Sequence, residues 1–186
     1  MIKQEKDYIK SQKKKYILYI GIWTVVVLGV FGIGFLITGE RTNLFTIIAG
    51  FLVIGLALSL SRLCVYLKFK DGNRHYATLI ENMKGSYNVF HSAIIPNSSV
   101  TILIEHIVVT SRNIYFLGLN EEVLKKHRLW LEKRLIAKGM DVKQLHFIHL
   151  THENSVKNII TKIEKDACFT SENLEEYTRR IEELII

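Results

Sequence analysis

The chain has 186 residues, of which 48% are apolar, and it carries 25 Lys plus Arg against 18 Asp plus Glu. A single Pro and a charged fraction of 23% exclude a collagen-like or Pro-rich chain, and two Cys are too few for a disulfide scaffold. The apolar residues are concentrated, because no residue carries a charge from 16 to 38 or from 42 to 61. This distribution predicts a membrane protein.

Two segments, residues 16–38 and 43–67, are predicted to cross the membrane as a helical hairpin. About 20 apolar residues span the hydrocarbon core as a helix, and the first segment supplies 23 uncharged residues. The second is uncharged to Ser61 and then contains Arg62, whose long side chain can reach the interface. A cleaved signal peptide is the competing interpretation of the first segment. We disfavour it because the apolar stretch is too long and no small-residue cleavage site precedes the second segment.

The flanking charges predict the orientation of the hairpin. Six lysines precede the first segment, Arg41 alone lies in the link, and three basic residues follow the second segment. The positive-inside rule then places both termini in the cytoplasm of a multi-pass cell-membrane protein. Residues 1–15 form a basic cytoplasmic segment of net charge +4, whose Lys13, Lys14 and Lys15 are candidates for contact with the anionic headgroups of the lipid bilayer. On this topology Cys64 and Cys168 are expected to stay reduced.

Glycines in both predicted spans would allow helices to approach closely, either within the hairpin or between copies of the protein in a homo-oligomer. They are residues 21, 29, 32, 34, 50 and 55. Neither span has an ionisable residue near its middle, which favours a plain membrane anchor over an ion path.

Residues 68–186 are predicted to form one cytoplasmic α/β domain. The order of elements is helix, three strands, helix, strand and helices, which favours a mixed sheet covered by helices, with the second and third strands forming a hairpin. Leu124, Leu131 and Leu135 lie along one stripe of the long helix, and Ser171 is a candidate N-cap for the last helix, with Leu174 and Tyr177 facing inward. The predicted helices are 73–84, 121–138, 155–165 and 171–184, and the predicted strands are 87–95, 100–110, 114–119 and 142–150.

Three stretches in this region form a recognisable motif. They are Tyr87-Asn88-Val89-Phe90-His91, then Ile104-Glu105-His106-Ile107-Val108-Val109-Thr110, and then Asn113-Ile114-Tyr115-Phe116-Leu117-Gly118-Leu119-Asn120. Together they resemble the nuclease-related (NERD) domain, over about residues 71 to 184. The resemblance implies a PD-(D/E)xK restriction-endonuclease-like fold. It also implies a divalent metal, commonly Mg²⁺, held by an acid on the first hairpin strand and a Glu on the second, with a Lys two residues further on.

The family's catalytic positions are degenerate in this chain. Glu105 is a remnant at the first acidic position, whereas Gly118 stands in place of the Glu and Asn120 in place of the Lys. One carboxylate is insufficient for Mg²⁺, which prefers six oxygen ligands. The resemblance therefore implies a domain without an intact catalytic site, metal or cofactor. A shifted register that recruits Glu121 or Glu122 is the alternative that would restore a metal-dependent nuclease.

Two further groups of residues are candidates for sites. His146, His149 and His152 recur every third residue, but a strand turns the first two to opposite faces, so we expect no zinc site. Lys125, Lys126 and Arg128 belong to a basic surface of the long helix and are candidates for phosphate contacts, to lipid or nucleic acid. An ordinary solvated helix face is the simpler interpretation.

These observations predict a membrane-anchored, catalytically inactive nuclease-like domain that acts as a cytoplasmic binding or scaffolding module. The alternatives are a membrane-tethered, Mg²⁺-dependent nuclease with a rearranged site, and a nucleic-acid-binding tether that does not cleave. The protein partner is not identified by the sequence.

Overall fold

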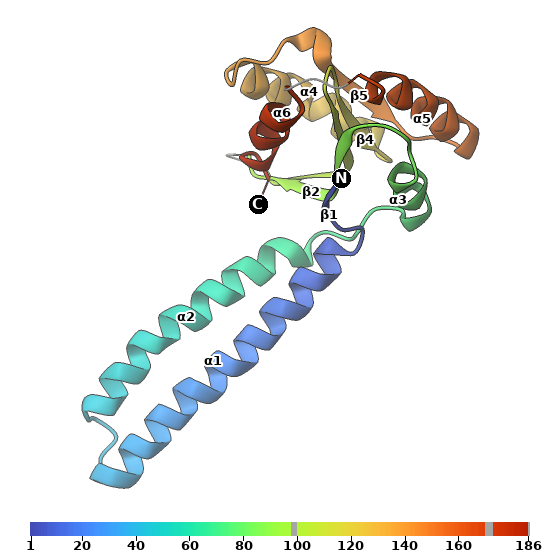
Figure 1. Ribbon diagram of the computed structural model, residues 1–186. Helices are drawn as coiled ribbons and strands as arrows, with labels where there is room; N and C mark the ends of the chain where they lie inside the picture. The colour runs from blue at the N-terminus through green and yellow to red at the C-terminus, as the bar shows by residue number, and fades with distance from the viewer. Residues whose placement is uncertain (98–99, 170–172, 186) are drawn as a thin grey trace. The chain divides into compact units, whose positions relative to one another are not determined.

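The structure is a computed structural model that describes residues 1–97, 100–169 and 173–185 (Figure 1). The chain divides into two compact units: Ile9–Lys70, and a second unit that combines Met1–Tyr8 with Asp71–Ile186. Residues 1–15, which we expected to form one basic segment, are divided between the two units.

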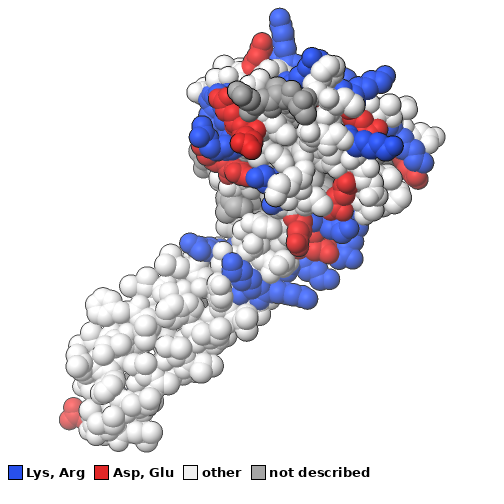
Figure 2. Space-filling view, in the orientation of Figure 1, with Lys and Arg blue, Asp and Glu red and all other residues white. Residues whose placement is uncertain are grey.

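The first unit is a helical hairpin of α1 (Tyr8–Thr38) and α2 (Leu44–Leu67), both long and apolar enough to cross a membrane. Most of the apolar side chains on the two helices are exposed, as lipid-facing side chains would be. Figure 2 shows that the surface of the hairpin is free of charge along most of its length. The first helix begins at Tyr8 rather than at residue 16, so Lys13, Lys14 and Lys15 are helical.

The two helices of the hairpin are joined by a short turn and pack through aromatic rings. Gly39 adopts a φ of +66° after α1, and the Asn43 side chain accepts the Thr46 N–H at 3.0 Å as the N-cap of α2. The rings of Tyr16 and Tyr66 stack with centroids 5.7 Å apart. The turn closes one end of the hairpin, and the Tyr16–Tyr66 contact joins the two helices at the other end.

Two of the six glycines face the neighbouring helix inside this hairpin. A Cβ at Gly55 would lie 2.8 Å from the Trp23 ring, and one at Gly34 would lie 2.3 Å from Phe45. The other four have open space at the Cβ position: residues 21, 29, 32 and 50. Intramolecular packing therefore explains only Gly34 and Gly55.

The second unit is built on one five-stranded sheet with the order β1-β2-β3-β4-β5. The antiparallel central strands are β2 (Tyr87–Ile95), β3 (Ile102–Thr110) and β4 (Ile114–Gly118). β5 (Leu145–His149) runs parallel to β4, as expected for a strand-helix-strand crossover. The mixed sheet and the hairpin of β3 and β4 are confirmed. The edge strand β1 (Ile2–Gln4), parallel to β2, was not predicted.

Four helices cover the two faces of the sheet (Figure 1). One face carries α4 (Glu121–Ile136) and α6 (Asn173–Glu182), and the other carries α3 (Arg74–Glu81) and α5 (Glu153–Ala167). A short 3₁₀ turn, Val142–Gln144, precedes β5 and replaces the first part of the predicted strand 142–150. The N-cap prediction for Ser171 lies outside the described residues.

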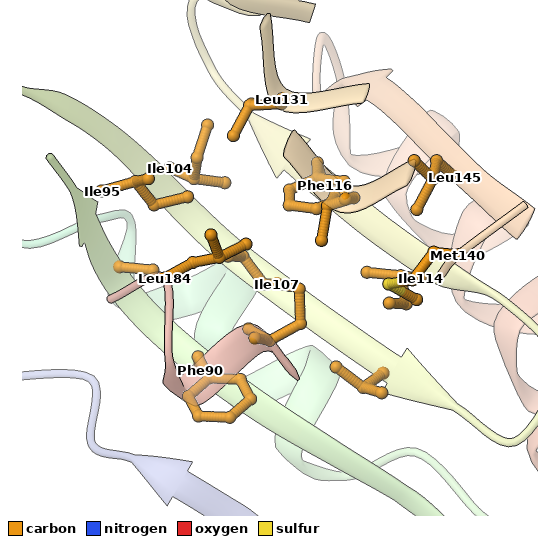
Figure 3. Packing of buried hydrophobic residues seen from close by; sticks show 14 of the residues in the cluster. Phe90, Ile95, Ile104, Ile107, Ile114, Phe116, Leu131, Met140, Leu145 and Leu184 are labelled. Atoms are coloured by element: carbon orange, nitrogen blue, oxygen red, sulfur yellow. The ribbon is translucent and has the colours of Figure 1, made fainter. Parts of the chain in front are cut away.

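The apolar core has one cluster on each face. The first cluster contains Leu131 and Leu135 of α4, Ile181 of α6 and Phe116 of β4, and Figure 3 shows Leu131 and Phe116 among its side chains. Ile80 of α3 and Ile163 of α5 pack on the opposite face of the sheet in the second. Leu124, Leu131, Leu135 and Tyr177 are buried as predicted. Burial of these aliphatic and aromatic side chains is the main force that holds the layers together.

In both β2 and β3, the alternation of side chains between the two faces of the sheet shifts by one residue partway along the strand. On the α4 side, the buried residues are Phe90 before this point in β2 and Ala93 after it. β3 makes the matching change between Ile104 and Ile107, while the pairing of the two strands stays in register. A regular strand keeps one parity of residues on each face. The backbone of both strands is therefore irregular at the same level, which is where the polar residues described next are found.

Candidate functional site

Glu105 of β3 is the acidic residue expected at the family's metal-binding position, and it is half-buried. The carboxylate accepts hydrogen bonds from the backbone N–H of Leu119 and of Glu105 itself. Burial raises the pKa of Glu105, which the two backbone N–H groups and nearby His149 partly offset. The carboxylate is thus held by the protein's own backbone at the end of the sheet next to α4.

Gly118 and Asn120 are the positions at which the resemblance leads us to expect a Glu and a Lys. Gly118 ends β4 beside Glu105, and Asn120 follows two residues later. A Cβ built at Gly118 would lie 2.9 Å from Glu105 Oε2 and 3.0 Å from a methyl carbon of Leu124. The Glu105 carboxylate and Leu124 therefore fill the space into which a side chain at position 118 would project. Asn120 is the N-cap of α4 and accepts the Val123 N–H at 3.1 Å. Both positions have structural roles in this chain.

The acids proposed for a rearranged metal site do not assemble with Glu105. Glu121 lies 2.6 Å from Lys125 Nζ and 3.9 Å from His149 Nδ1, and the Lys125 ammonium holds the pKa of Glu121 below its ordinary value. Within residues 1–97, 100–169 and 173–185, no three His, Cys, Asp or Glu side chains come together in a way that could hold a metal ion. Glu105 contributes a partly buried carboxyl group to this end of the sheet, and His149 lies close enough to influence its pKa.

The three histidines at intervals of three have different partners. The His146 ring stacks on Tyr115 with centroids 5.0 Å apart, whereas His149 Nε2 lies 2.9 Å from the carbonyl oxygen of Leu119. His152 is the exposed residue that precedes α5. Each histidine therefore has its own surroundings.

The basic residues proposed for phosphate contacts are exposed, and several are paired locally. Lys125 pairs with Glu121, and Arg128 Nε lies 2.7 Å from Glu132 Oε1 one turn along α4. Lys126 is exposed on the same helix. The Lys125–Glu121 pair is exposed to solvent, whereas Glu132 is largely buried beside Arg128.

The three lysines near the start of α1 differ in their surroundings. Lys13 Nζ donates to the Phe69 carbonyl at 2.6 Å, whereas Lys15 lies 5.7 Å from the centre of the Tyr19 ring. Lys14 is exposed to solvent. Of these three lysines, Lys14 and Lys15 have exposed side chains, as does Lys10 earlier in α1.

A second polar group, which the sequence analysis missed, is buried in the middle of β2 and β3. His91 and His106 are 0% and 1% exposed, and their Nδ1 atoms lie 2.8 Å apart. His91 Nε2 is 3.4 Å from Glu81 Oε1, and Lys6 Nζ is 3.3 Å from Glu81 Oε2. These four residues form a continuous polar chain from the surface to the centre of the sheet.

The two Nε2 atoms of this histidine pair are buried. His91 Nε2 faces the Glu81 carboxylate at 3.4 Å, whereas His106 Nε2 makes no hydrogen bond within the described part of the chain. Burial lowers the pKa of both rings, and for His106 the value falls to about 3, with His91 as a secondary cause. A buried polar atom without a partner costs about 1–3 kcal/mol, so such an arrangement is retained against a free-energy penalty.

Ser92, next to His91, has a φ of +55° although it is fully buried and is not glycine. Its side chain and backbone hold two other segments: Oγ accepts the Gly72 N–H at 3.0 Å, and the carbonyl oxygen accepts Gln4 Nε2 at 3.3 Å. A left-handed conformation costs a non-glycine residue about 1–2 kcal/mol. This conformation also produces the change of faces in β2.

The sequence offered one signal for this second group, the presence of a histidine on each of two predicted neighbouring strands. Their meeting depends on the register of the strands and on the conformation of Ser92, neither of which a residue pattern specifies.

Comparison of the chain with protein-family models, with curated proteins and with solved structures found no match.

Proposed function

We propose that this protein is a membrane-anchored, nuclease-related (NERD-like) domain without nuclease activity, which serves as a binding or scaffolding module on the cytoplasmic side of the cell membrane. The α1–α2 hairpin is the proposed anchor, and the unit of residues 1–8 and 71–186 is the proposed module.

The observation that carries the proposed loss of activity is the relation between Glu105 and Gly118. A PD-(D/E)xK nuclease needs two acids that share a metal ion, and the metal activates water and offsets charge on the phosphoryl oxygens. Here the only acid of the strand pair is held by backbone N–H groups and occupies the space beside Gly118. A second carboxylate at position 118 would need Glu105 to move away.

Two observations support the proposed topology. Residues 1–8 and 71–186 belong to one folded unit, which requires both ends of the hairpin to emerge on the same side of a membrane. The basic residues flank these two ends, with six lysines before the first span and Lys68, Lys70 and Arg74 after the second. The positive-inside rule assigns that side to the cytoplasm.

The topology is tested by labelling single cysteines in intact cells with a membrane-impermeant maleimide. Cys168 is exposed, so a Cys64→Ser variant makes it the sole reporter for the α/β unit. We expect labelling only after the membrane is permeabilised. A Thr42→Cys substitution in a chain without the two native cysteines is the matched control and should label in intact cells. Labelling of Cys168 in intact cells would contradict the proposal.

The proposed lack of nuclease activity is tested on the full chain in detergent, with single- and double-stranded DNA and RNA and with Mg²⁺ or Mn²⁺. We expect no cleavage above that of a Glu105→Ala variant prepared in parallel. Metal-dependent cleavage that Glu105→Ala abolishes would establish the alternative, a nuclease with a rearranged site. The same samples report nucleic-acid binding, whose dependence on salt would decrease on neutralising Lys125, Lys126 and Arg128 if α4 were the binding surface.

A further inference from the structure

The buried histidine pair lies where both connections to the helical hairpin attach to the sheet. Residues 1–8 lead into α1, and residues 71–73 follow α2 and begin the folded part of the second unit. Gln4 and Gly72 both bond to Ser92, the neighbour of His91. A Cβ at Gly72 would lie 3.4 Å from His106 Cε1, so this glycine covers the second ring closely.

The hydrogen-bonding pattern fixes how the pair holds its protons. The Glu81 carboxylate favours a proton on His91 Nε2, which faces it at 3.4 Å. His91 Nδ1 is then an acceptor, and His106 Nδ1–H donates to it across 2.8 Å. His106 Nε2 is left with a lone pair and no partner among the described residues. The neutral pair therefore makes one internal hydrogen bond, and His106 Nε2 remains as a basic nitrogen that can accept a proton.

At low pH the histidine pair is protonated in two steps. The first added proton binds His106 Nε2, and transfer of the shared Nδ1 proton then places the positive charge on His91, which faces Glu81. The second proton breaks the hydrogen bond between the two Nδ1 atoms and sets a second positive ring, His106, against the first. Both steps are relieved if water reaches the rings.

The charged groups around the pair do not remove this penalty. Glu81 of α3 stabilises a proton on His91, whereas Lys6, which pairs with the other oxygen of Glu81, opposes it. Glu105, the neighbour of His106 on β3, directs its carboxylate to the Leu119 N–H. His106 has no carboxylate among the causes that shift its pKa.

We propose that the His91–His106 pair is an acid-sensitive latch, whose protonation releases residues 1–8 and 71–73 from the edge of the sheet and so uncouples the α/β unit from its two connections to the helical hairpin. The released segments are those that cover the rings, and their departure admits water to both. The inference rests on the geometry of the buried pair and is independent of the proposed function.

Hydrogen exchange of the full chain in lipid nanodiscs tests the latch. Protection factors, which divide out the pH dependence of intrinsic exchange, are measured for β1 and β2 at pH 7.5 and pH 5. A group with a native pKa of about 3 and an ordinary value of 6.5 predicts a loss of protection of roughly 30-fold over this range. Protection in β4 should change much less. Unchanged protection in β1 and β2 at pH 5 would overturn the proposal.

Substitution of the histidines distinguishes the effect of protonating the pair from other effects of low pH on protection. In a His91→Gln, His106→Gln double variant, the two amides can still bond to each other but cannot bind a proton. We expect this variant to keep most of its β1–β2 protection at pH 5, and a control, His152→Gln at an exposed site, to lose it like the native chain. A double variant with the native pH dependence would refute the latch.

A measurement on the native chain covers the case in which the double variant does not fold. With ¹⁵N-labelled histidine, the two buried rings should show one Nδ1–H and one Nε2–H tautomer at neutral pH. They should titrate only as β1 loses protection. Two rings that titrate near pH 6.5 while β1 stays protected would also refute the proposal.

Discussion

The carboxylate of Glu105 lies where a side chain at position 118 would have to go. A Cβ on Gly118 would come within 2.9 Å of Glu105 Oε2. The glycine therefore supports a specific placement of the acid, and the two positions are coupled in stability as well as in any metal binding.

We expect Gly118→Ala to destabilise the α/β unit by about 1–2 kcal/mol, because the new methyl group displaces Glu105 and presses on Leu124. The measurement is chemical denaturation of the full chain in detergent. A double-mutant cycle with Glu105→Ala isolates the contact with Glu105. Gly118→Ala should lower the free energy of unfolding by less in the Glu105→Ala background than in the native chain. Additive effects would show that the carboxylate does not occupy this space.

The raised pKa of Glu105 predicts a pH dependence of stability with a definite sign. An acid whose pKa is higher in the folded state binds its proton more readily there, so its contribution to stability is full below the ordinary value of 4.5 and is lost as the pH rises through the raised pKa. Glu105→Gln carries no charge at any pH and keeps an acceptor for Leu119. We expect it to be more stable than the native chain at pH 7, by up to about 1 kcal/mol.

The advantage of Glu105→Gln should disappear below pH 4.5 when the two chains are compared by denaturation across the pH range. Glu5→Gln, at an exposed acid, is the control and should leave the difference near zero throughout. A Glu105→Gln variant that is less stable at pH 7 would mean that the ionised carboxylate contributes favourably to the fold.

Tyr115 connects the sheet to α5. Its ring is fully buried, and its hydroxyl donates to Asp166 Oδ2, to which Asn113 Nδ2 also donates at 2.7 Å. We expect Tyr115→Phe to lower the free energy of unfolding by about 1.5–3 kcal/mol, because a hydrogen bond to a charged group is lost while the packing of the ring is kept. Tyr76→Phe, at a half-buried ring on α3, is the matched control. Equal effects of the two substitutions would contradict the role given to the Asp166 contact.

Within the helical hairpin, Gly55 and Gly21 should respond differently to a larger side chain. A Cβ at Gly55 meets the Trp23 ring, whereas the Cβ position of Gly21 is open. Gly55→Leu should therefore force α1 and α2 apart and destabilise the hairpin by about 1–3 kcal/mol, and Gly21→Leu should leave it unchanged. Thermal unfolding in nanodiscs measures both effects.

Cross-linking in the membrane then tests the predicted homo-oligomer separately. A loss of cross-linked dimer in Gly21→Leu, with an intact hairpin, would place an interface between copies at the open glycines. Retention of the dimer in this variant would exclude Gly21 from such an interface.

Residue patterns predicted the elements with strong periodicity and missed those that depend on distant partners. β2 matches the predicted range, and the apolar stripe of α4 packs on the sheet as expected. β1 has only three residues, and the lysines around it are equally typical of a basic membrane flank, so no local signal marks it as a strand. Its partner lies more than eighty residues later, at Val89.

The two polar groups illustrate the same limit. Glu105, Gly118 and Asn120 were identified by their positions in a motif, but the motif does not reveal that the acid fills the space beside the glycine. His91 and His106 were missed because their contact requires the register of β2 on β3 and an unusual conformation at Ser92. Both facts arise from tertiary packing.

The pairing of β1 with β2 also constrains the order of events during synthesis. The ribosome makes Ile2 first and Val89 much later, and at about 5–20 residues per second several seconds separate them. Both apolar helices leave the ribosome in that interval, so on the proposed topology β1 can pair only after the second helix has returned the growing chain to the side of the bilayer on which β1 lies. A copy that inserted only one helix would leave β1 and β2 on opposite sides of the membrane. β2 would then be an unpaired edge strand, which proteases and chaperones can recognise as a sign of faulty assembly.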